Sequence, residues 1–297
     1  MKKVLFSILA VAAVVACNKN DVTPSQPAGE PGAIKFGVSG LVATKAVSES
    51  DANTVQASGF NVAGIVDETT VYFNELASFD AVNSNYATAT QYYYPTGKTL
   101  DFYAVHPVNR TIAVAADGAV TVAYEQTNTE DLIVAKREDV AASAGDVALT
   151  YDHVLSQLVF TVKGADTKAD YLLKSINVTA PNGGTYKFAD GQWTRGEDAV
   201  EAYWATDLEV STSEPTAVEE SMTFLPGAVV IEATWETYVN SKLIASYTKA
   251  TAAGAIELEM GKKNTINLTL PNADAQGITF TVTVNPWGAV SQDVTLN

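Results

Sequence analysis

The stretch TIAVAADGAVTVAY, residues 111–124, decides the fold class. On both sides of its centre, apolar residues alternate with small or polar ones, which is the two-residue period of a β-strand. Asp117 and Gly118 stand at the centre, and this dipeptide accepts the positive φ angles of a tight hairpin turn. The stretch therefore predicts two antiparallel strands joined by a short turn.

The same period continues along the chain from Ala33 onward, with Gly, Asn and Asp between the apolar runs. No segment of ten or more residues has convincing helical amphipathicity. REDVAASAGD, residues 137–146, has small residues, mixed charge and no strand pattern, so it is the most credible boundary, where one helical turn would fit. We predict an all-β chain with two tandem antiparallel β-sandwich domains, at residues 33–144 and 145–297.

The N-terminus predicts export. Two lysines, a short apolar run at residues 4–15 and small residues before Cys17 form the pattern of a secretory signal. The run is shorter than the roughly 20 apolar residues that span a bilayer. The ending VVAC resembles a bacterial lipobox, which predicts a signal peptide at residues 1–16 and acyl chains such as palmitate on Cys17 of an outer-membrane lipoprotein. An ordinary signal peptide with a chance cysteine is the alternative.

Residues 17–32 are polar and rich in Pro and Gly, which predicts a flexible tether between the lipid and the fold. The alternative is an ordered, extended arm. Cys17 is the single cysteine of the chain, so no disulfide within one chain can form and stability has to come from burial.

The charge of the chain excludes one class of partner. There are 34 acidic and 18 basic side chains, for a formal net charge of −16. Such a surface repels phosphate backbones, so nucleic-acid binding is not expected. The acidity is better explained by solubility at a cell surface.

The groups that could carry catalysis form no recognisable motif. The two histidines, His106 and His153, lack the spacing of a metal site, and we expect each to be a structural residue at the end of a strand. Adjacent carboxylates could serve as a glycosidase pair, but side chains of neighbouring strand residues usually point apart. The acidic pairs are Glu130 and Asp131, Glu138 and Asp139, and Glu219 and Glu220. We predict no enzyme activity, no metal and no cofactor.

Several aromatic residues allow a second hypothesis, a surface lipoprotein that binds a glycan or a host protein without polymerising. They are Tyr92, Tyr93, Tyr94, Trp193, Tyr203 and Trp204. Together they could form a platform on which sugars stack. Consecutive tyrosines also occur where one face of a strand joins the core and the other covers a neighbour, and both interpretations stay open.

The order of several segments resembles the fimbrillins of Bacteroidales, the lipoprotein-derived subunits of type V pili. These segments are the lipobox, the tether, a first strand that ends in a basic residue followed by Ala, LDFYAVHP, DLIVAKRED, LTYDHVLSQLVFTVK and ITFTVTVNPW. The resemblance covers nearly the whole chain and implies two transthyretin-like β-sandwich domains. It implies a stalk, tip or anchor subunit of a surface fimbria, with a role in adhesion and with other fimbrial subunits as partners.

The resemblance also implies a route of assembly. A trypsin-like protease would cut between Lys45 and Ala46, the first strand would leave, and a strand of the next subunit would fill its place. The released strand would carry Ile34, Phe36, Val38 and Val42, and the candidate donor strand carries Val290, Val294 and Leu296. Lys45 replaces the arginine of the family's best-known processing site, and an ordinary loop lysine is the alternative. The donor segment, residues 288–297, is only weakly apolar.

Overall fold

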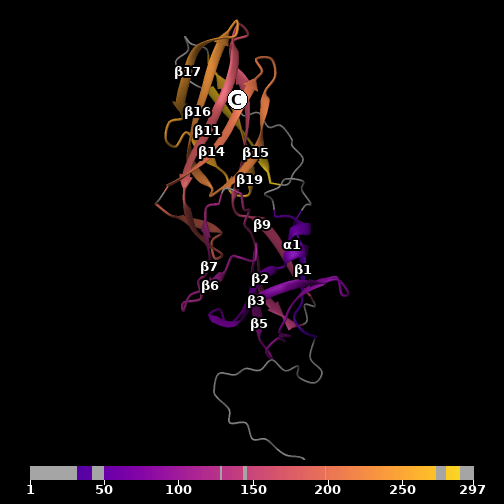
Figure 1. The fold of residues 1–297 in the computed structure, drawn as a ribbon. Helices are drawn as coiled ribbons and strands as arrows, with labels where there is room; N and C mark the ends of the chain where they lie inside the picture. Colours follow the sequence, from indigo (N-terminus) through magenta and orange to yellow (C-terminus); the bar gives the residue numbers. More distant parts are fainter. Residues whose placement is uncertain are drawn as a thin grey trace, which may run out of the picture.

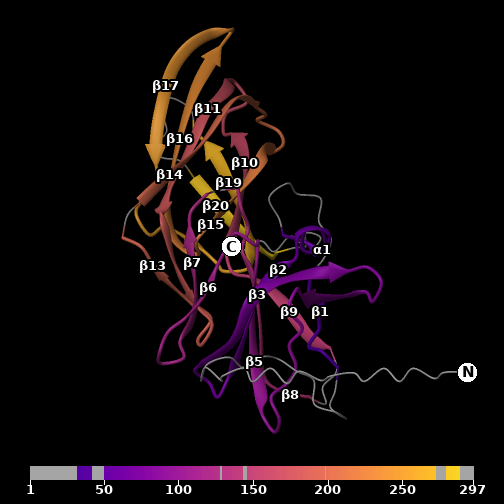
Figure 2. The ribbon, with the colours of Figure 1, turned by 60° about the horizontal axis from the view of Figure 1, so that its bottom comes forward.

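The computed structural model describes residues 32–41, 50–127, 129–142, 146–197, 199–271 and 279–287. The chain is nearly all β, as predicted, and the described residues include a single short helix, α1 at Ala52–Ser58. A closed sheet and α1 occupy one end of the molecule, and the strands of the second half occupy the other (Figures 1 and 2). No helix in these ranges is both long and apolar enough to cross a membrane.

The first half of the chain closes into a seven-stranded, barrel-like sheet around one apolar core. In spatial order the strands are β1 (Phe36–Ser39), β4 (Asn85–Thr88), β3 (Thr70–Asp80), β2 (Phe60–Val66), β5 (Thr99–His106), β8 (Ile133–Ala141) and β9 (Val147–His153). Because β9 also pairs with β1, the sheet has no free edge of the kind that pairs with other chains.

The second half packs two sheets against each other. One sheet contains β15 (Thr216–Phe224), β10 (Ser156–Gly164), β19 (Lys262–Leu270) and β20 (Thr279–Pro286). The other contains β14 (Ala199–Val210), β11 (Asp170–Pro181), β16 (Gly227–Val239) and β17 (Lys242–Ala250), and β18 (Ile256–Leu258) pairs with β16. The inner faces of both sheets contribute to one core, as in a β-sandwich.

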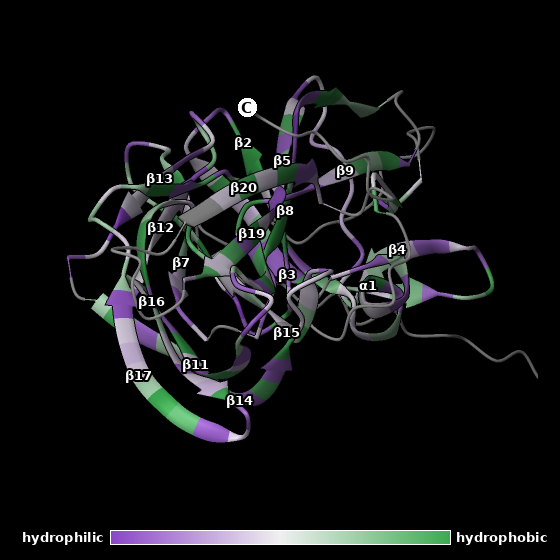
Figure 3. Cartoon of the chain, turned by 90° about the horizontal axis from the view of Figure 1, so that it is seen from above, coloured by the Kyte–Doolittle hydropathy of each residue, from purple (hydrophilic) through white to green (hydrophobic). Residues whose placement is uncertain are grey.

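Alternation of side chains explains this packing. Along β16 every second residue from Gly227 to Thr237 is buried, while the residues between them are exposed or half-buried. Strand β17 lies at the outside of its sheet and carries both apolar and polar residues (Figure 3).

A fourth sheet joins the two halves. The predicted hairpin at residues 111–124 is present as β6 (Ile112–Val114) and β7 (Val120–Glu125), with Gly118 at φ +86° in its turn. Strand β7 then pairs with β12 (Gly183–Lys187), which pairs with β13 (Gln192–Arg195). The Gln126 side chain contributes to the same junction, because its amide oxygen accepts a hydrogen bond from the Leu225 N–H at 3.3 Å.

Two local predictions need correction. Residues 137–141 were expected to lack strand structure, but they continue β8, which pairs with β5. Four consecutive exposed residues in β8 hide the alternation there. The sheets are also not purely antiparallel, because β1 pairs parallel to β9 and β10 parallel to β19. The division at residues 144/145 and the transthyretin-like form of the two halves stay predictions; β9 lies beyond that division and pairs within the barrel.

Candidate functional site

Strand β1, which belongs to the predicted released strand, closes the barrel between β4 and β9. It pairs in parallel with β9 from Phe36 opposite Val147 to Ser39 opposite Thr150, and Phe36 also lies opposite Tyr86 of β4. The Val147 N–H donates to the Lys35 carbonyl oxygen at 2.8 Å. Removal of β1 would therefore leave unpaired backbone groups on both β4 and β9.

The core-facing side chains of this strand are deeply buried. Ile34 is 4% exposed and Phe36 is fully buried, while Val38 is half-buried against the same core. The Phe36 ring meets Phe60 edge-on at 6.0 Å between ring centroids, and Phe102 at 5.5 Å. The prediction that Ile34, Phe36 and Val38 share one face of the strand is consistent with this packing.

The outer side of β1 carries a positive charge among carboxylates. The alternation that points Phe36 inward points Lys35 outward, and Lys35 lines a pocket of about 420 Å³ together with Asp146. The pKa of Asp80, at the end of β3, is lowered by the Asn83 side-chain amide above all, and by the Lys35 charge to a smaller extent. Strand β1 thus supplies a cation to an acidic edge of the barrel.

A glycine ends β1. Gly40 has φ +85°, and a Cβ atom there would lie 2.8 Å from Cγ2 of Thr150 and 3.0 Å from the Tyr151 carbonyl oxygen. Both the left-handed backbone and the close approach require glycine at this position. The remaining predicted site residues lie outside the described residues: Cys17, Val42, Lys45, Ala46, Val290, Val294 and Leu296.

The described chain resumes at Ser50, which is fixed to a buried carboxylate. The Ser50 N–H donates to Oδ2 of Asp131 at 2.9 Å, and Nδ1 of His153 lies 2.8 Å from the same oxygen. Asp51 then caps α1, because its carboxylate accepts from the Thr54 N–H at 2.8 Å. The beginning of α1 therefore stays attached to the barrel independently of β1.

The two histidines are the last residues of β5 and β9, as predicted. The His153 ring also stacks on Trp287, the last described residue, with ring centroids 4.5 Å apart. His106 is 5% exposed, and its Nδ1 lies 2.8 Å from the Gly59 carbonyl oxygen, which is suited to accept the Nδ1–H. Both side chains link strand ends to neighbouring segments.

Burial of His106 should make the stability of the fold depend on pH. Desolvation lowers the pKa of His106, and the Gly59 carbonyl and the nearby acids Asp131, Glu130 and Asp51 oppose that shift only in part. The unfolded chain, with a histidine pKa of about 6.5, then binds more protons than the folded chain, so the free energy of unfolding should fall as the pH drops below about 6.5. Urea unfolding of wild type and His106→Gln between pH 7.5 and 5 should give a smaller pH slope for the variant. Equal slopes would contradict this assignment.

Three members of the acidic pairs form ion pairs within the fold. Glu130 pairs with Arg110, and Asp131 pairs with His153 at 2.8 Å. Glu138 pairs with Lys136 at 3.1 Å. Across the described ranges, no three His, Cys, Asp or Glu side chains lie together in a way that could hold a metal ion.

The aromatic residues of the second hypothesis do not form one platform. Tyr94 is 7% exposed and its burial raises its pKa to about 12, while Tyr92 stacks on Phe73 in the barrel. Trp204 is 2% exposed in the sandwich core, and its neighbour Tyr203 is 59% exposed. Trp193 lies in the connecting sheet, where Nε1 donates to the Val154 carbonyl oxygen at 2.7 Å.

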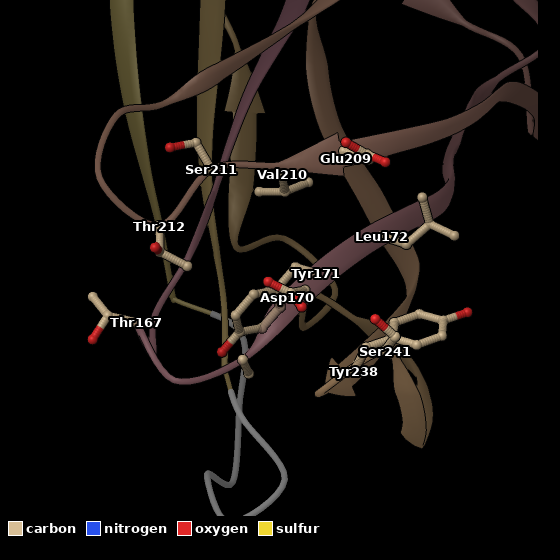
Figure 4. Close-up of a pocket in the computed structure, with 11 residues that line it drawn as sticks. Thr167, Asp170, Tyr171, Leu172, Glu209, Val210, Ser211, Thr212, Tyr238 and Ser241 are labelled. Carbon is tan, nitrogen blue, oxygen red and sulfur yellow. The ribbon is translucent and has the colours of Figure 1, made fainter.

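A pocket of about 620 Å³ lies beside the turn between β16 and β17 (Figure 4). That turn lies at the end of the molecule away from the barrel (Figure 2). Asp170, Glu209 and Tyr238 belong to its lining, and the remaining lining residues include four serine or threonine hydroxyls. This polar pocket was not predicted, because its residues are scattered over β11, β14 and β16 and their connections.

Comparison with known proteins relates this architecture to one family. A family model described as fimbrillin-like matches residues 37–287. A fimbrial protein from Bacteroides vulgatus has a similar structure, with a TM-score of 0.67 and 18% identity over 86% of this chain and 99% of that one. No curated protein matches the sequence.

Two candidate cell adhesion proteins are also similar in fold. The protein from Parabacteroides distasonis gives a TM-score of 0.56 at 10% identity, over 89% of this chain and 99% of that one. The protein from Bacteroides uniformis gives 0.51 at 18% identity, over 88% and 100%. At these identities the likeness concerns the fold.

Proposed function

Because the chain belongs to the fimbrillin-like family, we propose that it is a structural subunit of a cell-surface fimbria and contributes to adhesion. In this proposal the precursor reaches the outer membrane as a lipoprotein attached through Cys17, and its two halves are transthyretin-like sandwich domains. A trypsin-like protease cuts between Lys45 and Ala46, and β1 leaves. A strand of another fimbrial subunit then takes its place, in a stalk, tip or accessory position.

The observation that carries this proposal is the position of β1 in the barrel. Ile34 and Phe36 are buried, and full burial of such side chains contributes roughly 1.5–3 kcal/mol each before ordering costs. Loss of the strand exposes that apolar surface together with the unpaired groups of β4 and β9. A donated strand restores both at once, which is recognition by strand addition.

The geometry of exchange determines what is built. A strand from one subunit enters the barrel of the next, so each contact joins two different surfaces of the protein. Such head-to-tail contacts produce open filaments unless a rotation closes the ring. The bond from the Ser50 N–H to Asp131 fixes the chain just before α1 without β1, which supports survival of the barrel after the cut.

Protease treatment tests the proposal. Mild trypsin treatment of the purified precursor should give a mature chain that begins at Ala46, and this chain should form ladders resistant to boiling once a subunit with a fitting donor strand is present. Lys45→Gln should abolish both products, because trypsin needs a basic residue before the scissile bond. Lys98→Gln is the matched control, since Lys98 is an exposed lysine paired with Asp67 in the same half of the chain, and it should behave as wild type.

The N-terminal sequence of the protein from intact cells separates the roles. A mature chain that begins at Ala46 supports a polymerising subunit. A chain that still begins at lipidated Cys17 supports an anchor or the non-polymerising binder, for which the pocket lined by Asp170, Glu209 and Tyr238 would be the first place to examine. A precursor that trypsin leaves intact at Lys45, or that stays monomeric after the cut, would count heavily against a stalk role.

A further inference from the structure

The core side of the β1 position is shaped for an aromatic ring. The Phe36 ring stands at 79° to the ring of Phe60 and at 80° to that of Phe102, and Phe36 is fully buried. Such edge-to-face contacts add to the effect of apolar burial. A strand that brings a smaller side chain to this position would leave a cavity bordered by these two rings.

On the outer side of the same position, Lys35 lies near two carboxylates. Lys35 lines a pocket with Asp146, and its charge helps to lower the pKa of Asp80. Both carboxylates therefore lose a neighbouring positive charge when β1 leaves. An incoming strand with a basic residue at this position would replace that charge. An acidic residue there would be repelled.

The C-terminal segment of this chain meets neither requirement. Residues 288–297, GAVSQDVTLN, follow Trp287 directly and contain no aromatic and no basic residue. In any register that fills the three core positions, the residue at the Phe36 position is Val290, Val294 or a polar residue.

Val294 gives the best fit of these, and it fits poorly. If the segment runs parallel to β9, as β1 does, Asp293 takes the position of Lys35, next to Asp80 and Asp146. If it runs antiparallel, Thr295 takes that position and Gln292 takes the position of Val38. Both directions place valine where the barrel holds a phenyl ring.

We propose that the β1 position receives a strand from a different fimbrial subunit. The five residues of that strand that take positions 34 to 38 are, in order, aliphatic, basic, aromatic, of any type, and aliphatic. The β1 position selects against the C-terminal segment of a second copy of this chain. This inference rests on the proposed function and adds the chemistry of the partner strand. In the fimbria, the subunit that fills the β1 position of this chain would therefore be of a different kind.

Peptide competition on the cut chain tests the selectivity. The full-length precursor is cut with trypsin, the trypsin is inhibited and the released N-terminal fragment is removed in mild denaturant; a fluorescent peptide of residues 33–41, AIKFGVSGL, then reports binding by anisotropy. The same peptide with Phe36→Ala should bind about 100-fold more weakly or worse, as expected for loss of a buried phenyl group. The peptide with Lys35→Glu should bind several-fold more weakly, and this difference should shrink at about 1 M salt.

The segment 288–297 should compete about 100-fold less well than residues 33–41, and its Val294→Phe form should recover at least about tenfold. In the full chain, Val294→Phe should increase ladder formation after the cut. Thr295→Phe is the matched control: with residue 294 at the centre, residue 295 lies on the outer face, and a register centred on it would bury Asp293 and Asn297. Its ladders should stay at the wild-type level.

The outcomes separate the two proposals. Equal binding of segment 288–297 and of residues 33–41, or unweakened binding of the Phe36→Ala peptide, overturns the selectivity and leaves strand exchange intact. Equal ladder formation by Val294→Phe and Thr295→Phe also overturns it. If the peptide of residues 33–41 does not bind the cut chain at any concentration, strand exchange itself fails.

Discussion

Replacing Phe36 with alanine is expected to lower the free energy of unfolding of the uncut chain by about 3–5 kcal/mol. Phe36 is fully buried, it contacts Phe60 and Phe102, and β1 is held on both sides by β4 and β9. The surrounding strands limit how far the cavity can collapse. Urea unfolding followed by far-UV circular dichroism measures the loss. Tryptophan fluorescence is less suitable, because Trp204 and Trp235 lie in the sandwich core and Trp193 and Trp287 lie at the junction of the two halves.

Val71→Ala is the matched control for this variant. Val71 lies on β3 in the same barrel but is 44% exposed, so its truncation should change the free energy of unfolding by no more than about 0.5 kcal/mol. A Phe36→Ala chain that is as stable as Val71→Ala would mean that β1 contributes little to the barrel. The basis for strand release would then be lost.

Side-chain alternation predicted local strands well, but it did not predict their partners. The hairpin at residues 111–124 and its turn at Asp117 and Gly118 are present as expected. Its pairing with β12, across the junction between the halves, was not foreseen. Period two reports which face of a strand is buried, and it does not encode which distant strand lies alongside.

The same limit applies to the direction of β1. The sequence predicted Ile34, Phe36 and Val38 on one face, and the burial of Ile34 and Phe36 confirms that face. The parallel pairing with β9 depends on contacts with residues more than 100 positions away in the sequence. Helix α1 escaped prediction because it has seven residues and only Val55 is buried, which is too little for an amphipathic pattern.

The charged environment of the site was the least predictable part. Lys35 and Asp80 lie on neighbouring segments of the barrel only after β1 has paired with β4. The two tryptophans of the binding hypothesis likewise could not be placed from composition. Trp204 and Tyr203 are adjacent in sequence, and the strand directs one into the core and the other to solvent.

Replacing Trp204 with alanine is expected to lower the free energy of unfolding by about 3–5 kcal/mol, for a reason unrelated to ligand binding. Trp204 is 2% exposed and meets Phe160 edge-on at 5.1 Å between ring centroids, across the two sheets of the sandwich. Its loss removes a contact that joins β14 to β10. Urea unfolding measured by far-UV circular dichroism should show an earlier transition for this half of the molecule.

Tyr203→Ala provides the matched control, because it truncates the adjacent aromatic residue on the opposite face of the same strand. At 59% exposure it should change the free energy of unfolding by no more than about 0.5 kcal/mol.

Screening both variants on a glycan array then separates the two functional hypotheses. If Trp204→Ala kept wild-type stability and lost saturable glycan binding, the side chain would act at the surface, and the non-polymerising binder would replace the fimbrial subunit. Loss of stability in Trp204→Ala alone, with unchanged array signals in Tyr203→Ala, assigns Trp204 to the core and removes it from any sugar-binding platform.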